Sequence, residues 1–174
     1  MLRSAQAGDA QAYGELVARH RTSALRVAAV VLGSGDDADD VVQQAAARMW
    51  PAIGRVDADR GFRAWYLRGV ANTARNHRRS RGRRRNAELR LAGRRGDDPA
   101  DPAVAAVTTA EREMVLAALN RLDRDARLVL ALRHFEQLSE REMAAVLDCP
   151  VGTVKSRLAR ATARLRVELG GDGR

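Results

Sequence analysis

Apolar side chains recur along this chain at intervals of three and four residues, and no stretch alternates between apolar and polar positions for long. That spacing is typical of one face of an α-helix, whereas a half-buried strand alternates with a period of two. The pattern therefore predicts an all-α fold. A first helix is expected from about Asp9 to Leu32. Its candidates for the core are Tyr13, Leu16, Val17, Val27 and Val31.

Breaks in the pattern set the limits of the next helices. The stretch GSGDDADD, residues 33–40, supplies glycines for a turn and aspartates where a new helix begins. We expect these aspartates to cap free backbone amides and to favour the positive end of the helix dipole. The second helix should end at Trp50, because Pro51 disfavours helical backbone at the residue before it. A third helix is predicted from about Phe62, itself a core candidate, to Arg79.

A change of composition divides the chain into two parts. After an arginine-rich run, the stretch GDDPADPAVAAV combines prolines, aspartates and small residues, which is typical of a linker. We expect one small helical domain at residues 1–82, a flexible linker at 83–107 and a second small helical domain at 108–170. Thr108 and Glu111 have the spacing of a capping box, so the second domain is predicted to open with a helix there.

The end of the chain carries the pattern of a helix-turn-helix unit. Ser139 and Glu142 have capping-box spacing, and the stretch SEREMAAVL predicts a short helix after them. A tight turn at Asp148–Pro150 follows, and Pro150 suits the first turn of a new helix. In a helix-turn-helix unit the second helix enters the major groove of DNA.

The last helix has one apolar stripe and one basic face. The stripe consists of Val154, Leu158, Ala161 and Leu165. Small residues on the opposite face let the backbone approach base edges, where a hydroxyl or guanidinium can form hydrogen bonds, and flanking cations reach phosphates. The predicted DNA contacts are Lys155, Ser156, Arg157, Ala159, Arg160 and Arg164. A merely solvated basic face is the alternative interpretation of the same residues.

Composition agrees with a nucleic-acid partner. The chain has 31 Lys and Arg against 22 Asp and Glu, a net charge of +9. Such an excess favours a polyanionic partner, although a basic, well-solvated protein would have the same composition. Cys149 is the single cysteine, which excludes an internal disulfide and fits a reducing cytoplasm. Charges interrupt the first residues, and the longest apolar run, residues 27–32, is too short for a bilayer, so neither a signal peptide nor membrane insertion is expected.

No group of residues has the pattern of a catalytic centre. His20, His77 and His134 lie far apart in the sequence, and neither His77 nor His134 has metal-ligand spacing with Cys149. The phosphate-binding pattern G-x-x-x-x-G-K-[S/T] does not occur. We therefore expect no catalytic residues, no metal and no cofactor, and a protein that is not an enzyme.

The stretch LSEREMAAVLDCPVGTVKSRLARATARLR, residues 138–166, resembles the domain of bacterial sigma factors that reads the promoter −35 element, in the extracytoplasmic function (ECF) group of the sigma-70 family. It matches nearly every fixed position of the family pattern. Asp123 stands where the family often has proline, and it can begin a helix by capping.

Three stretches of the N-terminal half resemble the same family. AGDAQAYGELVARH resembles its opening helix, DDADDVVQQAAARMW its polymerase-binding segment, and GFRAWYLRGVANTARNHRRSR its segment that reads and opens the −10 element. Gln44 stands where glutamate is commonest, and Ala46 where an aromatic residue is usual. The resemblance covers almost the whole chain in the family's order.

The resemblance implies roles for particular residues. Contacts with the clamp helices of the polymerase β′ subunit are implied for Asp39, Asp40, Gln43, Gln44 and Arg48. Contacts with the −10 element are implied for Trp65, Arg68, Asn72, Arg75 and Asn76. Two alternatives stay open: Trp65 can be a core residue, and one of the two asparagines can brace a neighbouring loop.

The function implied is that of a dissociable subunit that binds core RNA polymerase, recognises the −35 and −10 elements and starts transcription of a specific regulon. The implied partners are core RNA polymerase, through its β′ clamp helices and β flap, promoter DNA and an anti-sigma factor, in the bacterial cytoplasm. The alternative is a stand-alone helix-turn-helix regulator that binds duplex DNA as a dimer and does not contact polymerase.

Overall fold

The computed structural model describes the chain at residues 1–57, 61–91 and 110–170. Within these ranges every regular element is a helix, so the predicted all-α class is confirmed. The capping box predicted at Thr108 lies outside the described residues, as do positions 92–107 of the predicted linker.

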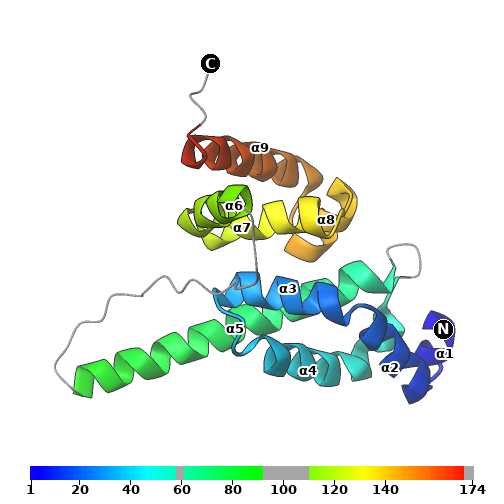
Figure 1. The fold of residues 1–174 in the computed structure, drawn as a ribbon. Helices are drawn as coiled ribbons and strands as arrows, with labels where there is room; N and C mark the ends of the chain where they lie inside the picture. Colours follow the sequence, from blue (N-terminus) through cyan, green and yellow to red (C-terminus); the bar gives the residue numbers. More distant parts are fainter. Residues whose placement is uncertain (58–60, 92–109, 171–174) are drawn as a thin grey trace.

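The N-terminal half is a bundle around three helices, α3, α4 and α5 (Figure 1). Two shorter helices, α1 and α2, lie at one end of this bundle, and the 3₁₀ turn η1 follows α4. The elements are α1 Leu2–Gln6, α2 Ala10–Arg19, α3 Arg21–Leu32, α4 Ala38–Met49, η1 Trp50–Arg55 and α5 Phe62–Leu91. As predicted, α4 ends just before Trp50-Pro51.

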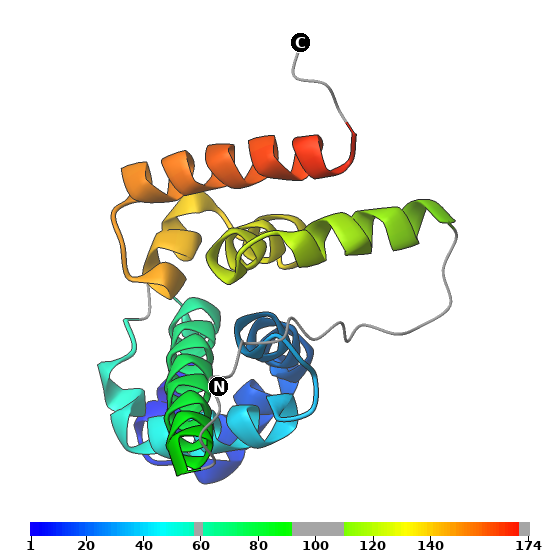
Figure 2. The ribbon, with the colours of Figure 1, turned by 90° about the vertical axis from the view of Figure 1, so that its left-hand side faces the viewer.

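The C-terminal half packs above α3 and α5 (Figures 1 and 2). Its α8 contacts α5, and its α7 contacts α3. The elements are α6 Ala110–Arg121, α7 Arg124–Leu130, the π-helical turn η2 Ala131–Phe135, α8 Glu140–Leu147 and α9 Val151–Glu168. Asp123 begins α7 as expected, because its side chain accepts a hydrogen bond from the Ala126 amide at 2.9 Å.

The prediction of one helix from Asp9 to Leu32 is wrong. The chain leaves helical geometry at His20, where φ is −105° and ψ is 9°, and the His20 ring stacks on Phe62 with centroids 5.8 Å apart. Residues on both sides of the break still point into one core, so the apolar spacing continues across it. Periodicity alone does not reveal a break of one residue.

The predicted end of the third helix near Arg79 is also wrong, because α5 continues to Leu91. Arginine is among the better helix formers, so a run of arginines extends a helix that has no proline to stop it. Residues 83–91, which the sequence assigned to the linker, are therefore helical.

The aspartates before α4 do not act as the caps that the sequence predicted. Asp37 is the N-cap residue, but its side chain caps no backbone amide. Its carboxylate instead lies 3.3 Å from His77 Nε2 and pairs with Arg81, both on α5. The turn before α4 is thus bound to the middle of α5 by these ion pairs.

Close packing of α4 on α5 depends on Gly69 of α5, where a Cβ would overlap the side chain of Met49, the last residue of α4.

Candidate nucleic-acid interface

The helix-turn-helix unit forms as its local signals predict. The Ser139 amide donates to Glu142 Oε2 at 2.8 Å, and the Glu142 amide donates to Ser139 Oγ at 3.3 Å, which completes the capping box of α8. The Ser139 hydroxyl, which donates to Glu142 Oε2 at 2.7 Å, and then the Ser139 amide hold the pKa of Glu142 below its ordinary value. Asp148 ends α8 in the left-handed conformation, with φ 54°, and Pro150 is the N-cap of α9 rather than a residue of its first turn.

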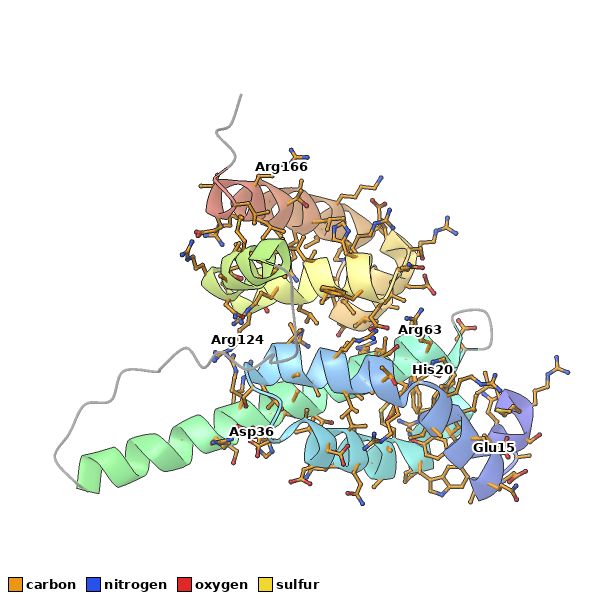
Figure 3. The ribbon with its side chains drawn as sticks, viewed as in Figure 1. Glu15, His20, Asp36, Arg63, Arg124 and Arg166 are labelled. Carbon is orange, nitrogen blue, oxygen red and sulfur yellow. The ribbon has the colours of Figure 1, made fainter. Side chains whose placement is uncertain are left out.

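The predicted apolar stripe of α9 packs against the rest of the C-terminal half. Val154 and Ala161 are buried, and Leu158 and Leu165 are half-buried. All six predicted DNA contacts lie on the exposed side of the helix: Lys155, Ser156, Arg157, Ala159, Arg160 and Arg164. Arg166, further along α9, also projects away from the molecule (Figure 3). The helix therefore presents a basic face to solvent.

Two cations of this face have carboxylate neighbours. Lys155 Nζ lies 3.7 Å from Glu140 Oε2 in α8. Arg164 pairs with Asp123, the cap residue of α7. Arg157 has no ion pair among the described residues. Because surface ion pairs of this kind are weak, the paired cations stay within reach of an anionic ligand.

The residues predicted to contact the −10 element lie along α5. Asn72 and Asn76 are exposed one helical turn apart, and Arg75 Nη1 donates to Asn72 Oδ1 at 3.0 Å. Trp65 is half-buried against the core, with its ring centroid 5.8 Å from that of Phe62, so its core role is confirmed in part. Arg68 pairs with Asp148 of the C-terminal half at 2.7 Å.

The residues predicted to contact polymerase share one face of α4. The buried face of this helix carries Val41, Val42 and Ala45. The five predicted contacts are all exposed: Asp39, Asp40, Gln43, Gln44 and Arg48. Asp39 pairs with Arg21 at the start of α3. The side chains that the sequence selected thus form a continuous exposed row.

Sequence reasoning missed one residue between the two halves. Glu136 follows η2 and is only 3% exposed, although it is a carboxylate. Its partners are Arg63 of α5 and Arg26 of α3, at 2.7 Å and 3.3 Å. A signal was present, because Glu136 follows Leu128 and Leu132 at intervals of four and so continues an apolar stripe.

The part of the chain that the structure describes contains no group of three or more histidines, cysteines or carboxylates that could hold a metal ion. In the same residues no helix is long and apolar enough to span a membrane.

Comparisons with known proteins match both halves. A family model for sigma-70 region 2 matches residues 16–84, and one for sigma-70 region 4 matches residues 112–165. The RNA polymerase sigma-H factor of Pseudomonas aeruginosa is 34% identical over 164 residues, which are 90% of this chain and 85% of that protein. The ECF RNA polymerase sigma-E factor of Escherichia coli K12 is 33% identical with the same coverage. The chain belongs to the ECF group of the sigma-70 family.

Solved structures agree with this assignment. The structure of CnrH in complex with the cytosolic domain of CnrY matches this sigma factor with a TM-score of 0.67 and 35% identity, over 99% of this chain and 96% of CnrH. The sigma factor RpoE of Bartonella quintana, in a complex with the anti-sigma factor NepR, matches with a TM-score of 0.71 and 24% identity, over 94% of this chain and 99% of that one, which supports the fold.

Family membership decides between the two functions that the sequence left open. The chain is a promoter-recognising sigma factor, and the region 2 match makes a stand-alone helix-turn-helix regulator the disfavoured alternative. Members of this family are transcription initiation factors rather than enzymes.

Proposed function

We propose that this sigma factor binds core RNA polymerase through the exposed face of α4, reads the −35 element with α9, and reads and opens the −10 element with α5. The proposal rests on the difference between the exposed side chains of α4 and those of α9. The exposed face of α4 is acidic and amide-rich, whereas that of α9 is basic and rests on an apolar stripe.

The proposed polymerase contacts are Asp39, Asp40, Gln43, Gln44 and Arg48, and they are expected to meet the β′ clamp helices. Region 4 is expected to meet the β flap. Exposed carboxylates and amides on a regular helix provide directional hydrogen bonds and electrostatic complementarity, which set the register and rate of association. Their continuous exposure on α4 supports this role.

The proposed DNA contacts fall into two groups. On α9, arginines close to small residues can form bidentate hydrogen bonds with guanine edges or reach phosphates. On α5, Asn72 and Asn76 carry both a donor and an acceptor, which suits the edge of an unpaired base. Holding a base out of the stack costs a few kcal/mol, which contacts of this kind must offset.

The proposed place of action is the bacterial cytoplasm, where polymerase works, and the proposed chemistry is binding alone, without catalysis. An anti-sigma factor is a further proposed partner, since the matched CnrH and RpoE structures are complexes with CnrY and with the anti-sigma factor NepR.

In vitro transcription with core polymerase on a promoter library tests the proposal, preceded by gel filtration of the mixture. Co-elution with polymerase and transcripts that start downstream of one recurrent pair of elements are the expected results. Elution as a free dimer that binds duplex DNA, with no transcript from any promoter, would select the stand-alone regulator instead.

A further inference from the structure

The long helix α5 continues beyond the bundle that packs around its first half (Figure 1). Among the described residues its last buried side chain is Ala74, which is 0% exposed, and residues 75–83 are all half-buried or exposed. We call residues 75–83 the α5 arm. Asn76, a proposed contact with an unpaired base, is the second residue of this arm. Part of the proposed base-reading surface therefore lies where the hydrophobic core no longer supports the helix.

Repulsion between arginines weakens the α5 arm as a helix. Arg75, Arg79 and Arg83 follow one another at intervals of four residues, and like charges at this spacing destabilise a helix. A helical segment without a packed apolar face is only marginally stable in water. Contacts with a base also tolerate only small errors in the position of the side chains that make them. The arm therefore needs a support other than the core.

One carboxylate from outside α5 contacts the arm at two places. Asp37 Oδ2, in the turn before α4, lies 3.3 Å from His77 Nε2 and accepts a hydrogen bond from Arg81 Nη1. His77 and Arg81 lie one turn apart, and the helical repeat of about 3.6 residues places them on a different side of α5 from Asn72 and Asn76. We call Asp37, His77 and Arg81 the Asp37 cluster. It holds the arm from one side and leaves the side that carries the asparagines exposed.

The stability of α4 does not account for this arrangement. Asp37 occupies the N-cap position of α4, where an aspartate side chain ordinarily accepts a hydrogen bond from an amide of the first turn, yet it caps no amide. An ion pair at the surface contributes no more to stability than such a cap does. The carboxylate thus forgoes a local contact and makes a distant one, which connects α4 to the α5 arm.

The Asp37 cluster lies between the two proposed binding faces of the N-terminal half. The proposed polymerase contacts on α4 begin with Asp39, two residues after Asp37, and Asn76 directly precedes His77. Beyond Ala74, no ion pair other than those of Asp37 joins the described part of α5 to the bundle. During promoter opening polymerase would hold α4 while DNA holds α5, so a tilt of the arm against α4 would displace the base contacts.

We propose that the Asp37 cluster is a set of positioning residues for promoter opening. It keeps the α5 arm helical and aligned with the polymerase-bound α4, so that Asn72 and Asn76 meet an unpaired base in a fixed geometry. The proposal rests on the proposed function, because it takes α4 as the polymerase-binding helix and α5 as the helix that opens the −10 element. Asp37, His77 and Arg81 act through the asparagines and do not themselves touch DNA.

An exchange of charges tests the proposal with the full chain and core polymerase. Asp37→Arg and Arg81→Asp each place like charges face to face. Each alone should therefore reduce open complexes about fivefold, measured by permanganate footprinting of unpaired thymines. The double variant restores an ion pair with its charges exchanged and should recover to within about twofold of the parent. Polymerase association and −35 binding should stay at the level of the parent in all three variants.

Arg81→Asp combined with Asp36→Arg is the matched control. It has the same net charge as the exchanged pair. Asp36, labelled in Figure 3, is the exposed neighbour of Asp37 and has no ion pair among the described residues. This control should stay about fivefold below the parent, because the new arginine does not replace the contact that Asp37 makes.

Amide hydrogen exchange of the free chain provides a second test that needs neither polymerase nor DNA. Asp37→Asn removes the charge and keeps a residue that is well suited to an N-cap. Amides of the α5 arm should exchange about threefold faster or more in Asp37→Asn than in the parent, because the arm opens locally more often. Asp36→Asn, which changes the net charge equally, should leave these rates unchanged.

The outcomes separate the positioning role from its alternatives. If the exchanged pair opens promoters no better than Arg81→Asp alone, Arg81 contacts DNA itself and the proposal is wrong. Equal recovery with Asp36→Arg would assign the effect to net charge, and loss of polymerase association together with open complexes would assign it to the folding of α4; either result overturns the positioning role. Full opening by both single variants, or unchanged hydrogen exchange in Asp37→Asn, would overturn it as well.

Failure of the unmodified chain to transcribe with polymerase would contradict the proposed function. Hydrogen exchange would still show in that case whether Asp37 holds the α5 arm, so the two failures can be told apart.

Discussion

The helices α4 and α9 are built alike and carry opposite charge. Each packs a narrow apolar stripe on its own half of the molecule and presents a row of polar side chains to solvent. The row on α4 contains Asp39, Asp40 and two glutamines, whereas the row on α9 contains Lys155 and several arginines. Since the framework is the same, we expect the chemistry of the exposed row to select the partner, which we propose is a protein for α4 and a polyanion for α9.

Each row also has charges that pair within its own half of the molecule, and on α9 these include Lys155, which lies beside Glu140. Asp39 of α4 pairs with Arg21, and Arg164 of α9 pairs with Asp123. These pairs lie at the surface, where the net contribution of an ion pair is small. The rest of each row is what distinguishes the two helices, and substitutions there should separate polymerase binding from DNA binding.

The largest effect is expected from reversal of charge on α4. Asp40→Arg with Gln43→Arg should reduce polymerase association about hundredfold, because like charges at a docking face add repulsion to the loss of hydrogen bonds. A pull-down with core polymerase measures the loss, and circular dichroism checks the fold. Arg19→Ala, at an exposed position outside the row, is the control. Normal recovery of the correctly folded double variant would show that α4 is not the polymerase face.

Removing positive charge from the exposed face of α9 should weaken DNA binding and leave polymerase binding unchanged. Arg157→Ala and Arg160→Ala should each weaken binding to a promoter with a matched −35 element, by about 1–3 kcal/mol if the side chain contacts a base. Binding of the holoenzyme to matched and scrambled −35 duplexes distinguishes the two kinds of contact, because loss of a phosphate contact weakens both duplexes alike. If both variants bind as tightly as the parent and Arg19→Ala, the assignment of the reading face is wrong.

The local signals that define these two helices could be identified in the sequence. A capping box, a tight turn and an uninterrupted apolar stripe all act within a few residues, which is why α8 and α9 were predicted correctly. The residues of the α4 row were instead implied by the family resemblance, and the structure places them on the exposed side of the helix. The break at His20 escaped prediction because stacking on Phe62, a residue distant in the sequence, accompanies it.

Contacts between the two halves were beyond the reach of periodicity. The division into domains treats each half as a separate body, so nothing in it indicates that Glu136 would meet Arg26 and Arg63 across the interface. Asp37 was misassigned for a similar reason, since a cap and a long-range ion pair require the same residue type. When the partners of a charged residue lie far away in the sequence, the spacing of residues can draw attention to that residue but does not indicate what it contacts.

An intermediate effect is expected from substitutions on α5. This helix lies in the N-terminal half with α4 but, like α9, is proposed to bind promoter DNA. Asn72→Ala with Asn76→Ala should leave polymerase association and −35 binding nearly unchanged and reduce open complexes about tenfold, because a lost contact with an unpaired base costs roughly 1–3 kcal/mol. Permanganate footprinting of unpaired thymines measures the open complex. A promoter mismatched at −10 should recover part of the activity, since melting is then supplied and base contacts are not.

Arg19→Ala, at an exposed position outside the predicted −10 contacts, is again the control. If Asn72 serves only to brace Arg75, which donates to Asn72 Oδ1, Asn72→Ala should cause no further loss of open complexes in an Arg75→Ala background. Full-strength footprints on the intact duplex with both asparagines replaced would remove them from the DNA-reading surface.

The smallest effects should come from the two exposed ion pairs, and they sharpen the comparison of α4 with α9. Asp123 also caps α7 through the Ala126 amide, whereas Asp39 makes only its ion pair in the described structure. Asp123→Ala should therefore lower the free energy of unfolding by about 0.5–2 kcal/mol, and Asp39→Ala by less than about 0.5 kcal/mol. Asp123→Asn keeps a capping oxygen and removes the charge, so it should recover most of the loss if the cap is the source.

The dependence on pH gives an independent check. The Ala126 amide, followed by Arg164, holds the pKa of Asp123 below its ordinary value. A carboxylate whose pKa is lower in the folded chain stabilises the fold above its unfolded pKa of about 4, and this contribution is lost as the pH falls through the folded value. Urea unfolding of the parent and Asp123→Ala should therefore differ most near pH 7 and converge below about pH 3. A difference that stays constant over this range would mean that the ionised cap does not stabilise α7.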